Sequence, residues 1–382
     1  MMRSYVAITR EIDDVEAAVD EILKALDIEN NLLKNSLGII SCFSEFAETG
    51  VLKAVCDRLP FDCIGATSCL CSCGHETDQI IFTITVLTSD VCTFDTVVIP
   101  IDTDYENTIN NTLSKKLEQH DEKPALFLSY FPLLKTIGGD QLLSAIDKTS
   151  DGIPLFGTVC IDHNMDYSTA STLHNGVPHQ EAVVLGLIFG QLNCSFEVAS
   201  IDEDKIRKQK AVITESKGNI LLGVNGKTAT EYLNEIGISE AEMKAGLGII
   251  PLVIDHKDGT RPVARAVFGL TPDGYAICGG AMPVGTTLAL GRISSPDVIS
   301  TTEKALIPLI ESDGVILSYS CVARYFSMGL DNLAEAEKMS SIVGDMNYLL
   351  TYSGGEICPL PDKNGVLKNY FHNFTNVFCK LS

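Results

Sequence analysis

Two stretches near the C-terminus decide the fold: "VILSYSCVAR" (residues 315–324) and "NYLLTYSGGE" (residues 347–356). Each begins with an apolar run of strand length and ends in small or polar residues. Residues 331–343, between them, have the apolar period of a helix, which Gly344 ends. Such a helical crossover predicts parallel neighbouring strands with their carboxyl ends at one edge of the sheet.

A ligand site is expected at that edge, because α/β sheets bind ligands outside the carboxyl ends of their strands. The residues predicted to converge there are Cys321, Arg324, Ser353, Gly354, Gly355 and Glu356. Arginine can hold a ligand carboxylate with two hydrogen bonds, glycines let backbone N–H groups approach a ligand, and Glu356 would bind an ammonium group. The alternatives are an internal ion pair of Arg324 with an acid such as Glu356, and glycines that only turn the chain.

The rest of the chain alternates strand-length apolar runs with helical patterns. The expected strands include "LGIISCF" (37–43), "DCIGATSCL" (62–70), "QIIFTITVLTS" (79–89), "PALFLSYF" (124–131), "IPLFGTVC" (153–160) and "EAVVLGLIFG" (181–190). We expect "FEVASI" (196–201) to pair with the last of these as a hairpin. This pattern predicts an α/β fold of two layered domains with mixed sheets and β-hairpins. The charged segment 202–210 separates them, so the domains are expected at residues 1–208 and 209–382.

Composition narrows the class of protein. Hydrophobic residues make up 45% and charged residues 20% of the 382 residues, as in ordinary globular proteins. The net charge of −22 repels phosphate backbones, so nucleic acid is not an expected partner of this acidic protein. No apolar run has the length of a membrane helix, and the N-terminus lacks the apolar core of a signal peptide. We therefore expect a cytoplasmic protein without membrane contact.

The thirteen cysteines raise the question of a metal or redox site, above all in "ATSCLCSCGH" (66–75). In an extended strand Cys69, Cys71 and Cys73 would be roughly 6–7 Å apart, whereas zinc needs about 2.3 Å to each sulfur. A turn that brings in His75 is the alternative. We interpret the element as a strand end that forms a pocket wall, with Thr67 and Ser68 as ligand contacts, and expect neither metal nor cofactor.

Several motifs in this order resemble the FIST family (F-box and intracellular signal transduction proteins). They are "SCVAR" (320–324), "EAEKM" (335–339), "YSGGEI" (352–357), "HNFT" (372–375), "RAVFG" with Arg265, and "GGAMPVG" (279–285). The N-terminal elements "CIGATSC" and "LFGTVC" match more loosely. The resemblance covers about residues 5 to 375.

This resemblance implies a sensory module that binds a small ligand, with amino acids proposed. Arg265 and Asn373 join the candidate ligand contacts, with a structural salt bridge and structural hydrogen bonds as their alternatives. Family members in bacteria often stand beside output domains. None is recognised in this sequence, so we expect signal transduction through a separate protein.

Two other functions compete with ligand binding. Cys321 is a candidate nucleophile of a thiol-dependent enzyme, because a thiolate beside Arg324 would be activated and His372 could act as its base. Some proteins of the resembled family sense nitric oxide through haem, so a haem or redox sensor is the other alternative. The loop 162–176, with His163 and His174, is a candidate cover for a pocket, and surface histidines are its plain alternative.

Overall fold

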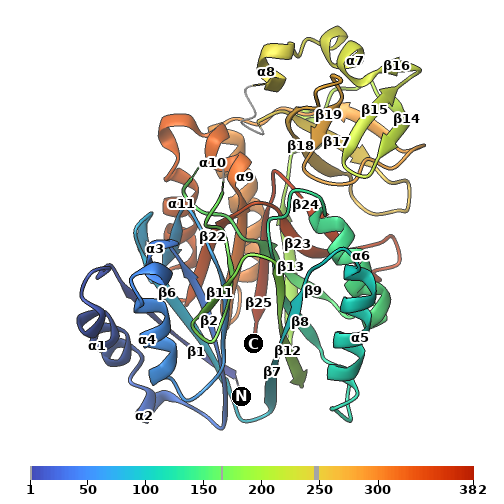
Figure 1. Ribbon diagram of the computed structural model, residues 1–382. Coiled ribbons are helices and arrows are strands. Elements are labelled where there is room, and N and C mark those ends of the chain that lie inside the picture. Colours follow the sequence, from blue (N-terminus) through green and yellow to red (C-terminus); the bar gives the residue numbers. More distant parts are fainter. Residues whose placement is uncertain (1, 165–166, 245–248) are drawn as a thin grey trace.

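The computed structural model describes residues 2–164, 167–244 and 249–382. Three mixed six-stranded sheets form the body of the molecule, and a seven-stranded antiparallel sheet lies apart from them (Figure 1). The predicted α/β class with mixed sheets and hairpins is confirmed. In the described ranges, no helix is long and apolar enough to span a membrane.

The first sheet has the order β1-β6-β2-β3-β10-β11, and only β2 and β3 are parallel. Its strands are β1 (Met2–Thr9), β2 (Asn35–Cys42), β3 (Cys63–Thr67), β6 (Phe82–Ser89), β10 (Thr172–His174) and β11 (Val177–His179). Its helices are α1 (Val15–Leu26), α2 (Ile28–Asn31), α3 (Glu45–Glu48) and α4 (Val51–Arg58). Asp14 caps α1 by accepting the N–H of Ala17.

The second sheet repeats this plan in the order β24-β23-β9-β8-β12-β7, with β8 and β9 parallel. Its strands are β7 (Cys92–Pro100), β8 (Leu126–Phe131), β9 (Leu155–Val159), β12 (Ala182–Gly190), β23 (Glu356–Pro361) and β24 (Leu367–His372). The helices α5 (Tyr105–Leu117) and α6 (Gly139–Ser150) cover its outer face (Figure 1).

The third sheet, β13-β25-β21-β22-β4-β5, contains the two strands that decided the prediction. Its strands are β4 (Cys71–Cys73), β5 (Glu76–Asp78), β13 (Cys194–Ala199), β21 (Val315–Cys321), β22 (Tyr348–Ser353) and β25 (Asn376–Leu381). Its helices are α9 (Ser295–Leu306), α10 (Val322–Ser327) and α11 (Ala334–Val343), with short 3₁₀ turns at Ile307–Leu309 and Gly329–Asp331. The predicted parallel pairing is confirmed, since Cys321 lies opposite Ser353.

Three successive repeats of the chain build these sheets: β1 to β6, β7 to β12, and β13 with β21 to β25. Each repeat lends its hairpin to the sheet of another repeat. The β4–β5 hairpin of the first repeat pairs with β22, the β10–β11 hairpin of the second pairs with β3, and the β23–β24 hairpin of the third pairs with β9. The exchange therefore closes a ring around a common core. Tyr130 of β8 and Tyr319 of β21 meet in that core, with 2.8 Å between their hydroxyl oxygens.

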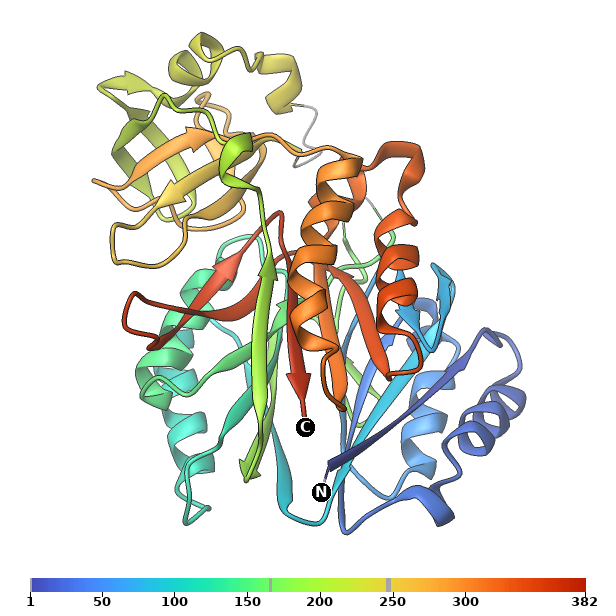
Figure 2. The same cartoon turned by 180° about the vertical axis from the view of Figure 1, so that it is seen from behind.

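The fourth sheet is inserted into the third repeat, between β13 and α9. Its order is β14-β20-β17-β18-β19-β15-β16, and an additional β14–β15 pairing closes it into a barrel, the inserted barrel. The elements are β14 (Ala211–Lys217), β15 (Ile220–Val224), β16 (Lys227–Thr228), β17 (Pro251–Asp255), β18 (Val263–Leu270), β19 (Ala276–Cys278), β20 (Thr287–Leu290), α7 (Ala229–Glu235) and α8 (Glu240–Lys244). A 3₁₀ turn, Glu203–Lys205, precedes the inserted barrel. Both views show this barrel at one end of the body (Figures 1 and 2).

The expected hairpin of residues 196–201 with residues 181–190 is wrong. The β13 strand pairs with β25 instead, because β7 and β8 already occupy both edges of β12. The division at residues 208 and 209 stays a prediction. It falls just before the inserted barrel, but strands from its two sides share the second and third sheets.

Candidate functional site

A buried polar cluster lies at the ends of β21 and β22. Ser353 Oγ donates to Glu356 Oε1 at 2.8 Å, and Thr375 Oγ1 donates to Oε2 at 2.7 Å. Cys321 lies beside Ser353 on the neighbouring strand. These four side chains are at most 1% exposed. The sheet edge thus brings Cys321, Ser353 and Glu356 together beneath the surface.

Burial sets the protonation state of this cluster. It raises the pKa of Glu356 to about 8, although hydrogen bonds from Thr375 and Ser353 act against it. At pH 7 Glu356 is therefore mostly a neutral acid. Burial, followed by the neighbouring Glu356, raises the pKa of the Cys321 thiol well above its ordinary value. A protonated thiol is a poor nucleophile, so this geometry does not favour the thiol-dependent enzyme.

The guanidinium of Arg324 binds partners outside this cluster. Its Nη2 and Nε donate to Glu335 Oε1 on α11, at 2.7 and 3.0 Å, and Nη2 also donates to the Val298 carbonyl at 3.0 Å. Arg324 and Glu335 are both 0% exposed. The ligand contact predicted for Arg324 would need this ion pair to open, and it stays a prediction.

Glu335 is the centre of the surrounding network. Burial acts to raise its pKa, but the Arg324 charge and the hydrogen bonds from Arg324, Thr302 and Ser320 outweigh burial and lower it. Tyr352 also donates to Glu335, at 3.1 Å. The sequence motif that contains Glu335 therefore supplies the partner of Arg324, in place of the Glu356 considered from the sequence.

Arg265 of β18 is a buried cation of another kind. Among the described residues no carboxylate lies within ion-pair distance of it, and its Nη1 donates to the carbonyls of Phe371 at 2.9 Å and Ala264 at 3.0 Å. The guanidinium carbon is 6.0 Å from the centre of the Phe371 ring. A side-chain carbon at Gly280 would lie 2.7 Å from its Nε, so only glycine lets the chain pass there.

A cavity of about 340 Å³ opens at the strand ends beside Arg265, and we call it the strand-end cavity. The segments after β8, β9, β21 and β22 line one side of it, and the inserted barrel lines the other. The lining residues are Pro132, Leu133, Leu134, Lys135, Ile137, Gly138, Gly139, Val159, Ile161, Tyr167, Asn219, Phe268, Ile277, Cys278, Gly279, Gly280, Val322, Gly354 and Phe371. Of the predicted site residues, Gly354 lines this cavity.

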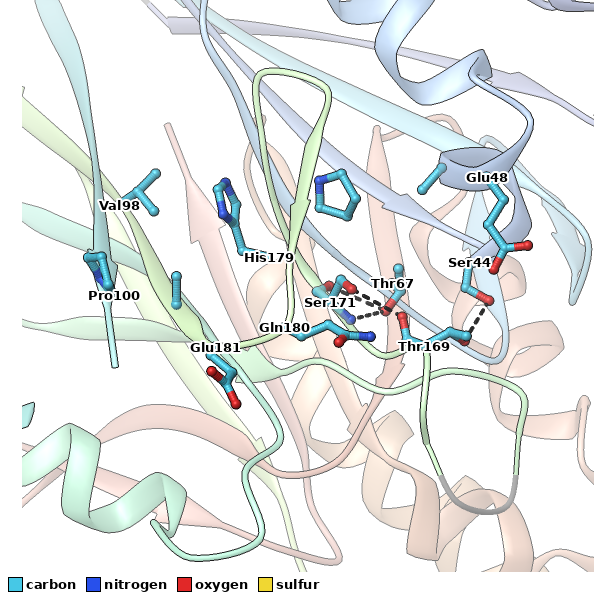
Figure 3. Close-up of a pocket in the computed structure, with 13 residues that line it drawn as sticks. Ser44, Glu48, Thr67, Val98, Pro100, Thr169, Ser171, His179, Gln180 and Glu181 are labelled. Carbon is cyan, nitrogen blue, oxygen red and sulfur yellow. Dashed lines mark hydrogen bonds between the residues drawn. The ribbon is translucent and has the colours of Figure 1, made fainter. Parts of the chain in front are cut away.

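A second cavity, of about 670 Å³, lies at the carboxyl ends of β2 and β3, and we call it the first-sheet cavity (Figure 3). Ser44, Ala47, Glu48, Thr67, Val98, Pro100, Thr169, Ser171, Pro178, His179, Gln180, Glu181 and Ala182 line it. Thr67 is the predicted contact found here. Thr169 and Ser171 come from the loop expected to cover a pocket, of which residues 165–166 lie outside the described part.

The other predicted residues serve the packing around these cavities. Ser68 is 0% exposed and donates to the Tyr352 carbonyl at 2.8 Å. Asn373 Oδ1 accepts the N–H of Ala266 at 3.3 Å and so ties the third repeat to the inserted barrel. A side-chain carbon at Gly355 would lie 2.3 Å from the Phe371 ring. Their ligand roles remain predictions.

The histidines and cysteines considered as catalytic or metal-binding residues each have a different partner in the structure. His372 Nε2 lies 3.0 Å from the Cys358 carbonyl, which can only accept, and burial lowers the pKa of His372 to about 4. His75 bonds Ser340, and Cys71 contacts Ser41. Within the described ranges, no three His, Cys, Asp or Glu side chains are grouped as metal ligands.

Comparison with known proteins identifies the class first: the family model of the FIST N domain matches residues 36–227, and that of the FIST C domain matches residues 229–359. The chain therefore belongs to the FIST family, whose domains are generally signal-transduction sensor domains. No curated protein matches the sequence. A solved cyanuric acid hydrolase, described as an evolutionary innovation by structural concatenation, is 9% identical with a TM-score of 0.37, over 100% of this chain and 99% of that chain.

The raised pKa of Glu356 makes stability depend on pH. The folded protein keeps a proton that the unfolded chain loses above its ordinary pKa of 4.5, so this contribution to stability is lost as pH rises toward 8. We expect the free energy of unfolding to fall by as much as about 4 kcal/mol over that range. Glu356→Gln should flatten this slope in denaturant titrations. Equal slopes for both proteins would contradict the buried acid.

Arg324 and Glu335 should act as a structural pair. Glu335→Gln leaves the Arg324 charge buried without its counter-charge, so we expect the free energy of unfolding to fall by about 3 kcal/mol. The double variant Arg324→Met, Glu335→Gln should lose less than the two single variants together. Chemical denaturation measures these losses, and additive losses would show that the two charges do not depend on each other.

Thiol labelling tests the enzyme alternative. Cys69 and Cys194 are the half-buried cysteines, whereas Cys321 is 1% exposed. We expect a thiol reagent to modify Cys69 and Cys194 first in the native protein, and Cys321 only after unfolding, as located by peptide mass spectrometry. Selective early modification of Cys321 would instead support a nucleophile.

Proposed function

We propose that this chain is a cytoplasmic small-molecule sensor, which binds a small carboxylate with an apolar body in the strand-end cavity and signals through a separate protein. An apolar amino acid belongs to this ligand class. The observation that carries the proposal is the buried charge of Arg265, directly behind the wall formed by Gly280 and Phe371. In the described part of the chain it has no carboxylate at ion-pair distance, and the Asp140 carboxylate acts on it from further away. Membership of a sensory family supports the same conclusion.

The size and the walls of the strand-end cavity suit a small apolar body. Its volume of about 340 Å³ is at the lower end of small-molecule sites. Leu133, Ile161, Phe268 and Val322 are among the apolar side chains that line it. Transfer of an apolar ligand group onto such walls releases water and supplies most of the affinity.

Three features favour an anionic group on this ligand. Arg265 keeps its charge in spite of burial. Lys135 lines the cavity from an exposed position, and the residues Gly138 and Gly139 at the amino end of α6 present the positive end of the helix dipole. No Asp or Glu is among the lining residues, all of which are described, but Asp140 follows Gly139 in the first turn of α6 and accepts the N–H of Ala281 at 2.7 Å. A ligand carboxylate would thus meet the charges of Arg265 and Lys135 with the carboxylate of Asp140 beside them.

The position of the cavity suggests how binding becomes a signal. Phe268 and Gly280 belong to the inserted barrel, whereas Val159 and Gly354 belong to the second and third repeats. A ligand that touches both sides favours the arrangement in which they are close together. A separate signalling protein would then recognise that arrangement. In this proposal Ser353, Gly355 and Glu356 support Gly354 from beneath.

Thermal and chemical denaturation with matched ligands tests this function. The probes are leucine, 4-methylpentanoate and the carboxamide of each, in which the carboxylate charge is removed and the apolar body is kept. At 100 times its Kd, a bound carboxylate should stabilise the protein by about 2.7 kcal/mol, and its amide should stabilise it much less. Ile137→Trp, at a partly exposed lining position, should abolish the effect by filling the cavity.

Lys135→Gln should weaken carboxylate binding, while Lys208→Gln, which removes an exposed charge elsewhere, should leave it unchanged. Equal stabilisation by acids and amides would overturn the anionic class. If none of these probes stabilised the protein, this ligand assignment would be overturned.

A further inference from the structure

The first-sheet cavity differs in chemistry from the strand-end cavity. Its lining contains two carboxylates, Glu48 and Glu181, and no lysine or arginine. In the described part of the chain neither carboxylate has a hydrogen-bonding or ion-pairing side chain, and both residues are exposed to solvent. Figure 3 shows them on opposite sides of the group formed by Thr67, Ser171 and Gln180. A ligand between them meets negative charge at both ends.

The polar wall between these carboxylates offers acceptors more than donors. Thr67 Oγ1 donates to the Ser171 carbonyl at 3.3 Å, and Ser171 Oγ donates to the Thr169 carbonyl at 3.1 Å. Gln180 Nε2 is also used, since it donates to the Ser168 carbonyl at 2.9 Å. The two hydroxyls thus donate their protons within the protein, and Gln180 uses one of its two amide protons there. Thr67 Oγ1 also accepts the N–H of Ser171 at 2.9 Å, so it keeps one lone pair for a ligand, whereas the side-chain oxygens of Ser171 and Gln180 keep two each.

The lining of the first-sheet cavity disfavours anionic ligands, and its location favours a binding site. His179 lies in the wall, and burial lowers its pKa, so it does not add a positive charge at neutral pH. A phosphate or carboxylate would find no cationic partner in the lining and would be repelled by Glu48 and Glu181. The location is also one where α/β sheets bind ligands, because β2 and β3 are parallel and end at the cavity.

We propose that the first-sheet cavity is a second binding site, specific for a small organic cation with an ammonium or guanidinium donor at each end. Glu48 and Glu181 would each bind one end, and the oxygens of Thr67, Ser171 and Gln180 would accept hydrogen bonds from the ligand between them. Nothing in this inference depends on the strand-end cavity. The two sites therefore select ligands of opposite charge.

Calorimetric titration with agmatine tests the site. Agmatine has a cationic group at each end, and 4-guanidinobutanoate keeps its guanidinium but carries a carboxylate at the other end. At physiological ionic strength, which screens the general surface charge, we expect saturable one-to-one binding of agmatine and much weaker binding of the carboxylate. The double variant Glu48→Gln, Glu181→Gln should raise the Kd of agmatine about tenfold.

Two controls separate the site from the acidic surface. The double variant Glu118→Gln, Glu122→Gln removes the same charge at exposed positions outside the cavity and should leave the Kd unchanged. Ala47→Phe fills the cavity without a change of charge and should abolish binding. Non-saturable binding, an equal loss in both Glu→Gln double variants, or equal affinity for the two probes would overturn the proposal. Lys135→Gln should not weaken agmatine binding, so failure here is distinct from failure of the proposed function.

Discussion

The cyclic exchange of hairpins is the constraint on which the rest of the structure depends. Each sheet ends in a hairpin that another repeat supplies, so no repeat completes its sheet alone. The three parallel pairs are consequently fixed around one core, where Tyr130 and Tyr319 meet. Loops that follow their carboxyl ends face loops of a neighbouring repeat, and both cavities lie in such crevices.

The sequence predicted those features that depend on local pattern. The apolar runs at residues 315–320 and 347–353, with a helix between them, require a parallel crossover whatever the rest of the chain does. Hairpin exchange has no such local signal. Residues 196–201 illustrate this limit: their pattern shows a strand, but their partner is β25, about 180 residues further along, because both edges of the nearer strand are already occupied.

The candidate site was predictable to a similar degree. Parallel neighbouring strands end at the same edge of a sheet, and this rule predicts that Cys321, Ser353 and Glu356 lie together. The motif "GGAMPVG" contains the glycines beside Arg265. The partner of Arg324 could not be deduced, since several acids have a suitable sequence distance and only packing selects Glu335. The residues Gly138 and Gly139 were also missed. Their role in the cavity arises from the position of α6 against Phe371, which no sequence spacing contains.

The two cavities differ more in the charge of their lining residues than in their shape. An acidic chain with a net charge of −22 attracts cations in general, so the first-sheet cavity would need only matched geometry to select the proposed organic cation. An anion faces the opposite problem and must be drawn into a field that the surface opposes. In the proposed function the buried charge of Arg265 would solve this problem, because a charge shielded from water acts more strongly over a short distance. An anion that binds in the strand-end cavity would then offset part of the cost of burying that charge, and in the proposed function this is how the protein responds to its ligand.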